Sequence, residues 1–320
     1  MTADILAAAR QTSILGTKFL RQVVPAFAVG AFAAQLLVEL GWLGTFSWLA
    51  RPLMRFGRLH PECGASFIVT LVSPTAGHSM LAEYRHQRRL GGLELIVAAV
   101  VNNLPGEIAT SKSLLPVVVP ALGVFGLAYY GILLCAAAIK AVLMLLLGRT
   151  LLPRPEYDGV HATADTPNPH VKLALRNALR TSSGIIFRVL KTMIPTAYAA
   201  AALITCGVFD KFGTRLGILA RYFPVTGTTL PVMAARLLSP IGAYTMAGSL
   251  FAAKAASGRE LVFSLVVGAL LSTGTNLRYL IPYYCGIFGP RSGAKVIGAS
   301  IAARIVSFAI VLAGMSVLWK

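Results

Sequence analysis

The chain has 320 residues, of which 56% are hydrophobic and only 12% are charged, and its mean hydropathy is +0.73. Soluble domains carry about 25% charged residues, so the composition excludes a water-soluble globular domain and predicts an all-α polytopic membrane protein. The 29 Lys and Arg outnumber the 11 Asp and Glu, which gives a net charge of +18. These cations stand in short groups between apolar runs rather than in one stripe. This pattern argues against nucleic acid as a partner and favours anionic lipid.

The first apolar run, from about Val23 to Trp42, follows a short basic segment at 1–21. The run lies too far into the chain and is too long for the apolar part of a signal peptide. It therefore predicts a first transmembrane helix in a multi-pass protein of the cell membrane. Beyond it, Arg51, Arg55 and Arg58 alternate with apolar residues at the spacing of a helix that lies along the membrane interface.

Further apolar segments follow this basic helix. A second membrane segment covers about Gly64 to Ala82, and a basic loop at 85–89 comes after it. An apolar stretch then starts at Leu93, is interrupted at 102–107 by Asn-Asn-Leu-Pro-Gly-Glu, and is followed by a long apolar run from Leu114 to Leu147. Since one span needs roughly 20 apolar residues, we expect about 8–10 transmembrane segments in the whole chain.

The second half of the chain repeats the first. Ser73–Met80 aligns with Ser239–Met246 at an offset of 166 residues, and the offset holds without a gap from 73 to 123. In these 51 pairs 12 residues are identical, where chance in so apolar a composition gives roughly four or five. A Pro-rich and then basic linker at 151–187 separates the copies, so the predicted repeats are 22–150 and 188–320.

Two copies of one helical unit in a membrane protein pack about a pseudo-two-fold axis and enclose a site between them. We expect the third apolar segment of each copy to be interrupted at the corresponding place, at 102–107 in the first copy and at 272–276 in the second. Broken or re-entrant backbone at membrane depth must line a cavity or be buried in protein. The unequal charge of the loops at 85–89 and 254–260 favours an inverted pair of repeats, whereas the basic N-terminus and the basic linker favour parallel copies.

Polar residues at the two interruptions are the candidate ligands of a small polar solute. They are Asn102, Asn103, Glu107, Thr273, Thr275 and Asn276. The amides suit a polar neutral ligand, although paired Asn before Leu-Pro-Gly is also ordinary turn chemistry. The carboxylate of Glu107 either binds a solute, a proton or a cation, or stabilises the first turn of the following helix.

Further candidates accompany the Ser-Pro pair of each copy. They are Ser73, Gly77, His78, Ser239 and Gly242. Each Ser-Pro pair predicts a helix discontinuity, and the glycines allow a neighbouring backbone to come close. A single His without Cys or carboxylate neighbours is more typical of a hydrogen-bonded packing residue than of a metal or proton ligand. The four cysteines are isolated from one another, so no metal site is predicted.

No enzyme signature occurs in the sequence. A P-loop, a GxSxG motif, an HExxH motif and a Rossmann fingerprint are all missing from it. We therefore expect no catalytic residues and no cofactor, and the chain by itself is not expected to use ATP.

These motifs together resemble those of the nucleoside-recognition, or Gate, domain family of membrane proteins, in a two-copy form. The resemblance rests on Ser73–Gly77, Leu90–Glu94 and the Asn pair in the first copy, and on Ser239–Met246, 258–261 and Thr275-Asn276 in the second. The family includes sporulation membrane proteins, the membrane part of ferrous iron transporters and concentrative nucleoside transporters. The resemblance implies inverted repeats around a central polar site. The second copy departs from it with Gly268 and Ala269 in place of the Asn pair, and the Cys-centred gate expected of an iron permease is missing.

The first functional hypothesis is a secondary transporter or permease for a small polar solute, such as a nucleoside or a related metabolite. Coupling to a proton or a sodium ion would then fall on Glu107. The alternatives are a non-transporting membrane scaffold or regulatory component, with contact surfaces at 51–58 and 211–221, and a divalent-metal permease. The expected partners are the lipid bilayer, with anionic lipid at the basic loops, and the solute. Association into a homo-oligomer is left open.

Overall fold

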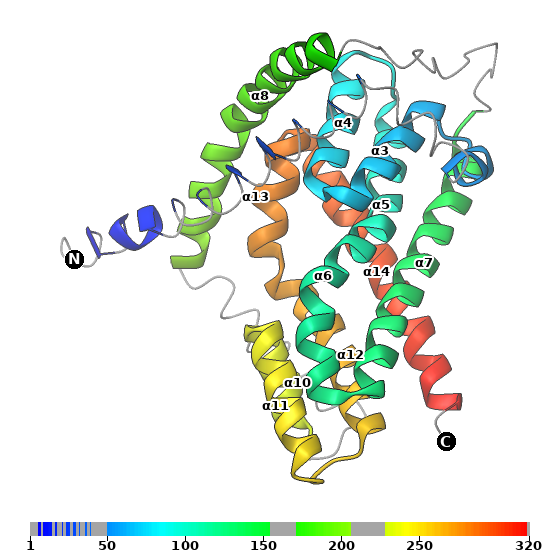
Figure 1. Cartoon of the computed structure of the whole chain (residues 1–320), viewed down its shortest axis with the longest axis vertical. Helices are drawn as coiled ribbons and strands as arrows, with labels where there is room; N and C mark the ends of the chain where they lie inside the picture. The colour runs from blue at the N-terminus through cyan, green and yellow to red at the C-terminus, as the bar shows by residue number, and fades with distance from the viewer. Residues whose placement is uncertain are drawn as a thin grey trace.

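The computed structural model describes residues 50–153, 171–205 and 228–318, together with scattered residues between 6 and 39. The described ranges fold into helices and contain no strand (Figure 1). In chain order the labelled helices are α3 (Pro61–Val72), α4 (Pro74–His86), α5 (Gly92–Val101), α6 (Asn103–Leu122), α7 (Val124–Leu151), α8 (Val171–Thr205), α10 (Leu230–Leu238), α11 (Pro240–Ala252), α12 (Gly258–Thr275), α13 (Leu277–Phe288) and α14 (Pro290–Leu318). The predicted first span at 23–42 lies, apart from scattered residues, outside the described part, as does the contact surface expected at 211–221.

Three of the described helical segments are long and apolar enough to cross a membrane. They are Gly92–Ser111, Val124–Leu151 and Pro290–Val317. A fourth span forms when α12 and α13, which meet at a bend of 56°, are taken together. The chain is therefore an all-α polytopic membrane protein. The total of about 8–10 segments stays a prediction, because the first expected span is not among the described residues.

The two copies share several helix boundaries. The offset of 166 residues carries the start of α5 to the start of α12, and the start of α7 to the start of α14. It also carries both ends of α4 onto both ends of α11. The duplication of the sequence is thus also a duplication of the structure.

The Ser-Pro pairs start equivalent helices in the two copies. The side-chain oxygens of Ser73 and Ser239 accept hydrogen bonds from the backbone N–H groups of Ala76 and Gly242, at 3.3 and 3.2 Å. The proline that follows each serine occupies the first helical turn, where its missing N–H is not needed. The predicted discontinuities are confirmed: each serine caps a new helix, α4 or α11, after the preceding helix has ended.

Equivalent turns also repeat. Arg88 and Lys254, which correspond at the same offset, have positive φ angles of 60° and 54°. Gly123 joins α6 to α7 with φ +58°, and its equivalent Gly289 joins α13 to α14 with φ +80°. Both turns use backbone conformations that only glycine adopts without strain.

The interruptions of the third apolar segments differ from the prediction. In the first copy only Asn102 leaves the helical pattern, and Glu107 lies inside α6 rather than in an unwound loop. In the second copy the break falls at Asn276, and its equivalent in the first copy is Thr110, eight residues beyond Asn102. The expected correspondence of the two breaks is therefore wrong. Each copy ends a helix at its own asparagine, a residue that favours helix ends, and Gly268 continues α12 at the place of Asn102.

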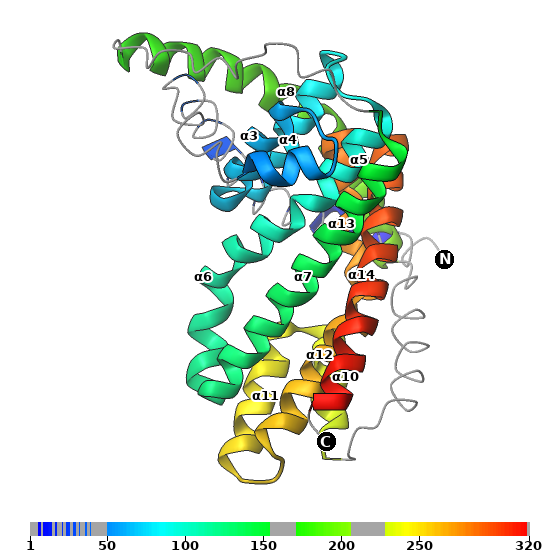
Figure 2. The ribbon, with the colours of Figure 1, turned by 90° about the vertical axis from the view of Figure 1, so that its right-hand side faces the viewer.

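The two repeats run in opposite directions through the molecule. Helices α3 and α4 lie at one end, and their equivalents α10 and α11 lie at the other (Figures 1 and 2). Helices α7 and α14 pack against each other, and they run antiparallel. The inverted arrangement, which the loop charges favoured over a parallel one, is the one present.

Each repeat contributes a short helical hairpin that turns back at its Ser-Pro pair. The tip of the α3–α4 hairpin lies close to the start of α6, where a Cβ atom at Gly106 would come within 3.8 Å of the Pro74 ring. The tip of the α10–α11 hairpin lies near α13, because an Nη atom of Arg278 is 3.5 Å from the carbonyl oxygen of Leu238. The two hairpins thus extend from opposite ends toward the middle of the long axis, which is the re-entrant geometry expected of such repeats.

The apolar core is divided into two main clusters along the long axis. One contains Tyr129 and Phe308, and the other contains Leu145 and Val296. Helices α7 and α14 run through both clusters. Between the clusters each of these helices carries a cation, Lys140 on α7 and Arg304 on α14, so a polar layer separates the two cores.

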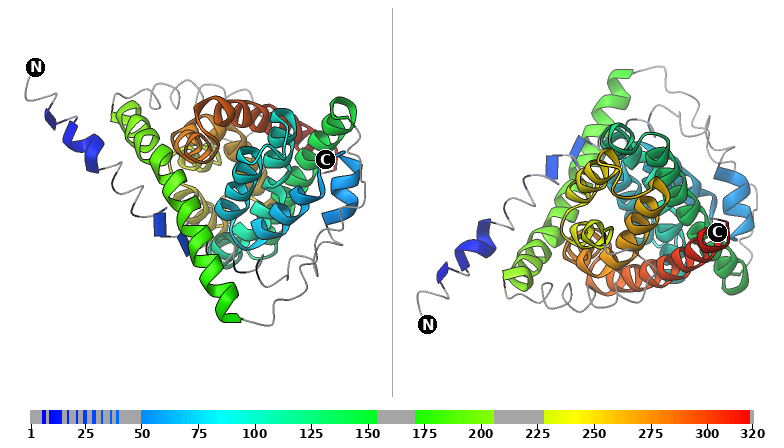
Figure 3. Two further views of the ribbon diagram at one scale, coloured as in Figure 1. Left: turned by 90° about the horizontal axis from the view of Figure 1, so that it is seen from above. Right: turned by 90° about the horizontal axis from the view of Figure 1, so that it is seen from below.

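The predicted linker and interfacial helix are partly described. Helix α8 starts at Val171, inside the segment 151–187, continues past residue 187, and lies on the outside of the bundle, where it packs on α13 (Figure 3). Residues 50–56 form a helix with Arg51 and Arg55 exposed and Met54 buried, as an interfacial helix requires. Arg58 lies beyond its end and donates a hydrogen bond to the carbonyl oxygen of Leu152 at 3.2 Å.

Candidate functional site

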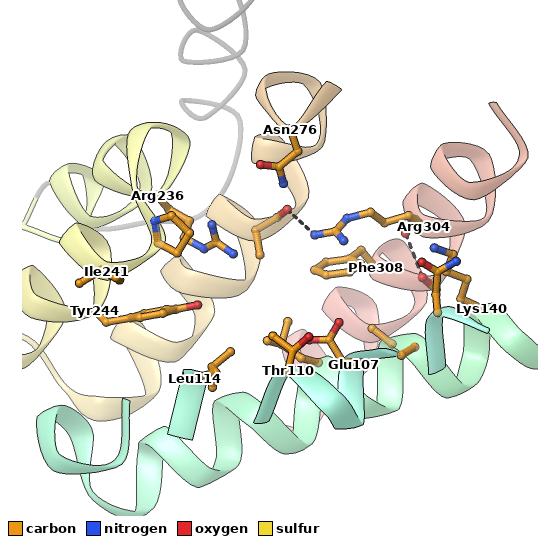
Figure 4. A pocket seen from close by; sticks show the side chains of 17 residues that line it. Glu107, Thr110, Leu114, Lys140, Arg236, Ile241, Tyr244, Asn276, Arg304 and Phe308 are labelled. Atoms are coloured by element: carbon orange, nitrogen blue, oxygen red, sulfur yellow. Dashed lines mark hydrogen bonds between the residues drawn. The ribbon is translucent and has the colours of Figure 1, made fainter. Parts of the chain in front are cut away.

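A cavity of about 390 Å³ lies between the two repeats at the level of the polar layer (Figure 4). Its walls come from α6 and α7 of the first repeat and from α10, α11, α12 and α14 of the second, with Asn276 at the α12–α13 break. Its polar and charged lining residues are Asn103, Glu107, Thr110, Lys140, Arg236, Tyr244, Asn276, Arg304 and Ser307. A cavity of this size holds a small organic molecule.

Three cations and one carboxylate line this cavity. Arg236 on α10 and Arg304 on α14 extend toward each other from opposite walls, and Glu107 and Lys140 belong to the wall formed by α6 and α7 (Figure 4). The formal charge of this group of four residues is +2. Charged groups at membrane depth are costly and normally face a partner or an aqueous cavity, so this cluster is the candidate functional site.

Two of the cations are anchored by hydrogen bonds. The Nζ atom of Lys140 donates to the Oγ atom of Ser300 on α14 at 2.8 Å, and the Lys140 side chain is buried. An Nη atom of Arg304 donates to the backbone carbonyl of Ala269 on α12 at 2.9 Å. The bond of Lys140 crosses the contact between the repeats, whereas the bond of Arg304 joins two helices of the second repeat.

Aromatic rings orient the two guanidinium groups. Arg304 lies over the ring of Phe308, at 4.7 Å from the ring centroid, and Arg236 lies 5.8 Å from the centroid of Tyr244. The hydroxyl of Tyr244 is 3.5 Å from that of Tyr129. Such contacts stabilise a guanidinium and leave its edge free for hydrogen bonds in the ring plane.

Several polar atoms at the cavity have no partner among the described residues. The Nε atoms of Arg236 and Arg304 are buried without a hydrogen bond. Among described residues, Glu107 also makes no ion pair or hydrogen bond. Buried polar atoms are normally satisfied, so unpaired donors around a cavity indicate a ligand or water in it.

Three of the residues predicted from the sequence line the cavity: Asn103, Glu107 and Asn276. The amide of Asn103 is already used, because its nitrogen donates to the carbonyl of Val100 at 3.0 Å and its oxygen accepts from the hydroxyl of Tyr284 at 3.2 Å. The side chains of Glu107 and Asn276 are therefore more available than that of Asn103 to bind a ligand in the cavity.

The other predicted residues of the interrupted segments lie beside the cavity. Asn102 is buried and donates to the Oγ atom of Ser66 at 3.0 Å, which ties α3 to the break. Thr275 donates to the carbonyl of Ser272 at 3.0 Å, and the buried Oγ1 atom of Thr273 has no partner among the described residues. None of these three is among the lining residues.

The candidates near the Ser-Pro pairs have structural contacts. Ser73 and Ser239 cap helices, and Gly77 packs against α3 where a Cβ atom would lie 2.7 Å from the carbonyl of Ser66. Gly242 donates its N–H to the cap of α11. Pro240 and Ile241 place this second hairpin, but not the first, against the cavity.

His78 joins the first hairpin to both repeats. Its Nδ1 atom lies 2.8 Å from the carbonyl of Pro74 and 3.1 Å from the hydroxyl of Tyr283, and its Nε2 atom lies 3.1 Å from the carbonyl of Ala99. Aromatic rings of α13 surround it edge to face. These contacts fix the His78 side chain in the packing between the helices.

Among the described residues, no group of three His, Cys, Asp or Glu side chains is placed to hold a metal ion.

Lys140, Arg236, Arg304 and Tyr244 of the cavity are not among the predicted site residues. A signal for two of them was present: Lys140 stands alone inside the apolar run Leu114–Leu147, and Arg304 inside the last apolar run. Isolated cations at the centre of a span are expensive and point to function. Their meeting in one cavity follows only from the inverted packing of the repeats.

The chain is similar to three proteins of the archaeon Methanocaldococcus jannaschii. It is 27% identical to the uncharacterized protein MJ1556 over 298 residues, which covers 92% of this chain and 94% of the relative. It is 23% identical to the uncharacterized protein MJ0871, with 89% of each chain covered, and 23% identical to the uncharacterized protein MJ0880, with 92% and 97% covered. No protein-family model and no solved structure matches the chain. The similarity extends over both repeats.

Proposed function

We propose that this protein is a secondary transporter or permease that carries a small polar solute through the cavity between its inverted repeats. The observation that supports this most is the position of the charged cavity, which lies between two oppositely directed copies of one unit. Inverted repeats of this kind provide two similar halves that open a central site alternately to either side of the membrane.

The re-entrant hairpins and the break at Asn276 support the same proposal. Irregular backbone at membrane depth is tolerated where it lines a wet cavity, and both Asn276 and the tip of the α10–α11 hairpin do so here. This arrangement agrees with what the resemblance to Gate-domain proteins implies, and a nucleoside or a related metabolite therefore remains among the proposed solutes. We place the protein in the cell membrane, with its basic loops against anionic lipid.

The divalent-metal alternative is not favoured by the cavity, because its formal charge of +2 from Lys140, Arg236, Arg304 and Glu107 repels a divalent cation. The scaffold alternative has its support in the exposed Arg51 and Arg55 on the helix at 50–56. A charged cavity between the repeats is not needed for that role, so transport accounts for more of the structure.

Uptake by the purified full-length chain in proteoliposomes tests the proposal. Radiolabelled uridine, succinate and phosphate are each offered with an imposed proton or sodium gradient, and empty liposomes are the control. We expect protein-dependent uptake of at least one solute, and we expect it to depend on one of the gradients. Protein-dependent uptake of none of them would contradict the proposal.

A further inference from the structure

The charges of the cavity do not balance within the protein. Lys140, Arg236 and Arg304 face a single carboxylate, that of Glu107. Three buried or half-buried cations with one anion leave excess positive charge away from bulk water, and this is unfavourable unless an anion compensates it. The described lining residues supply no second acid.

The unpaired N–H groups of Arg236 and Arg304 also indicate that the cavity binds an anion. Arg304 carries five N–H groups, of which one is in a hydrogen bond with Ala269, and its Nε atom is buried without a partner. The Nε atom of Arg236 is also buried and unpaired. Because a guanidinium presents parallel donors that fit the paired oxygens of a carboxylate or a phosphate, two such groups on opposite walls form a clamp for one anionic group (Figure 4).

The charges of the site are not a by-product of the duplication. At the offset of 166 residues, Arg236 corresponds to Thr70, Arg304 to Ala138 and Lys140 to Val306. Both arginines of the clamp therefore come from the second repeat, and the first repeat adds Lys140 and Glu107 from α7 and α6. Lys140 and Arg304 come together because α7 and α14 pack against each other.

We propose that the cavity binds a small soluble anion whose carboxylate or phosphate group lies between Arg236 and Arg304. Lys140 adds positive charge, Asn276 offers an amide for a further polar group, and Leu114 and Ile241 accommodate an apolar portion. This inference names the substrate class and rests on the proposed function for treating the cavity as the solute site, although binding itself can be measured without transport.

Thermal unfolding of the purified full-length chain in lipid-free detergent tests the proposal. Sodium phosphate and sodium succinate are titrated at constant ionic strength and pH against sodium chloride, with uridine as an uncharged polar control. We expect at least one of the two anions to raise the unfolding temperature in a saturable way, since a ligand that binds the folded state stabilises it by mass action. Chloride and uridine should have no such effect.

Variants then localise the binding. Arg236→Gln and Arg304→Gln should each raise the half-saturating anion concentration about tenfold or more, because each removes charged hydrogen-bond donors. The matched control is Arg149→Gln, which removes an exposed guanidinium that lies over Phe56 near the end of α7. Anion stabilisation that is equal in all three variants would overturn the proposal.

A second variant separates a binding effect from a loss of folding, because it should bind the anion more tightly. Glu107→Gln removes the opposing carboxylate and should lower the half-saturating concentration of the anion. A purely structural role of Glu107 would not predict this result. If neither anion stabilises the protein, the proposed soluble-anion site is wrong. It is also wrong if only added phosphatidylglycerol stabilises the protein, and the occupant is then a lipid headgroup.

The two proposals can fail separately. Anion binding without uptake in proteoliposomes would contradict the proposed transport but not the anion site. Uptake of uridine without anion binding would contradict the anion site but not the proposed transport.

Discussion

The Nζ atom of Lys140 donates a hydrogen bond of 2.8 Å to the Oγ atom of Ser300, which joins α7 of the first repeat to α14 of the second. The bond lies between the two apolar clusters and at the wall of the cavity. It fixes the cation where the two repeats meet, so it serves both the packing of the repeats and the charge of the site.

Loss of this bond should be measurable as an interaction energy. In a double-mutant cycle of Lys140→Met and Ser300→Ala, thermal unfolding in detergent should give a coupling energy of about 0.6 kcal/mol, the average for hydrogen bonds between membrane helices, and of at most about 1.7 kcal/mol. Ser316→Ala is the control, because Ser316 is exposed on the same helix and, among the described residues, its hydroxyl bonds only to the carbonyl of Ala313. Additive effects of the two substitutions would show that the bond contributes nothing.

The turn glycines give a second prediction, on stability. Gly123→Ala and Gly289→Ala should each destabilise the protein by about 1–3 kcal/mol, because φ angles of +58° and +80° are strained for alanine. A Cβ atom at either position would meet no neighbour within 4 Å, so the cost is conformational and not steric. Gly131 also has open space but lies inside α7, and Gly131→Ala should be neutral or stabilising by up to about 1 kcal/mol. Equal unfolding temperatures for all three variants would contradict this reading of the turns.

Gly77 and Gly242 provide a third prediction, because they were singled out for the same reason but differ in packing. A Cβ atom at Gly77 would overlap the side chain of Thr70 and approach the carbonyl of Ser66 to 2.7 Å, whereas one at Gly242 would stay at least 3.5 Å from Ser239. Gly77→Ala should therefore lower stability by about 1–3 kcal/mol, and Gly242→Ala should change it by less than about 0.5 kcal/mol. Chemical or thermal unfolding of the two variants compares them directly, and a larger loss at Gly242 would refute the assignment.

The repeat and its local signals could be predicted from the sequence. Ser-Pro at 73 and 239 and the equivalent glycines at 123 and 289 determine helix starts and turns through local backbone chemistry, so their structural outcome follows from a few neighbouring residues. The position of the second break was harder to predict. Several polar residues in 272–276 could each end a helix, and the packed structure uses Asn276 alone.

The cavity could be predicted only in part. Glu107 and Asn276 were found because they are polar residues near interruptions of apolar runs. Arg236, by contrast, lies in the short helix α10 with no unusual neighbours in the sequence, and it faces Arg304 of the same repeat because α10 and α14 both pack on α12. Local sequence patterns carry no information on whether two cations so far apart in the chain line one cavity.

Glu107 provides the last prediction, on coupling. It is the only carboxylate among the described residues that line the cavity, and it makes no ion pair or hydrogen bond with described residues. A proton or a sodium ion that travels with the solute would therefore bind here, and Glu107→Gln should abolish gradient-dependent uptake in proteoliposomes while the unfolding temperature changes little. The matched control is Glu83→Gln, since Glu83 lies on α4, outside the cavity, and accepts a hydrogen bond from Gln87 at 3.0 Å. The control should take up solute as the parent chain does. If gradient-dependent uptake persists in Glu107→Gln, this carboxylate has no part in the coupling step. If the variant still exchanges solute but no longer responds to the gradient, Glu107 couples the ion and is not needed to bind the solute.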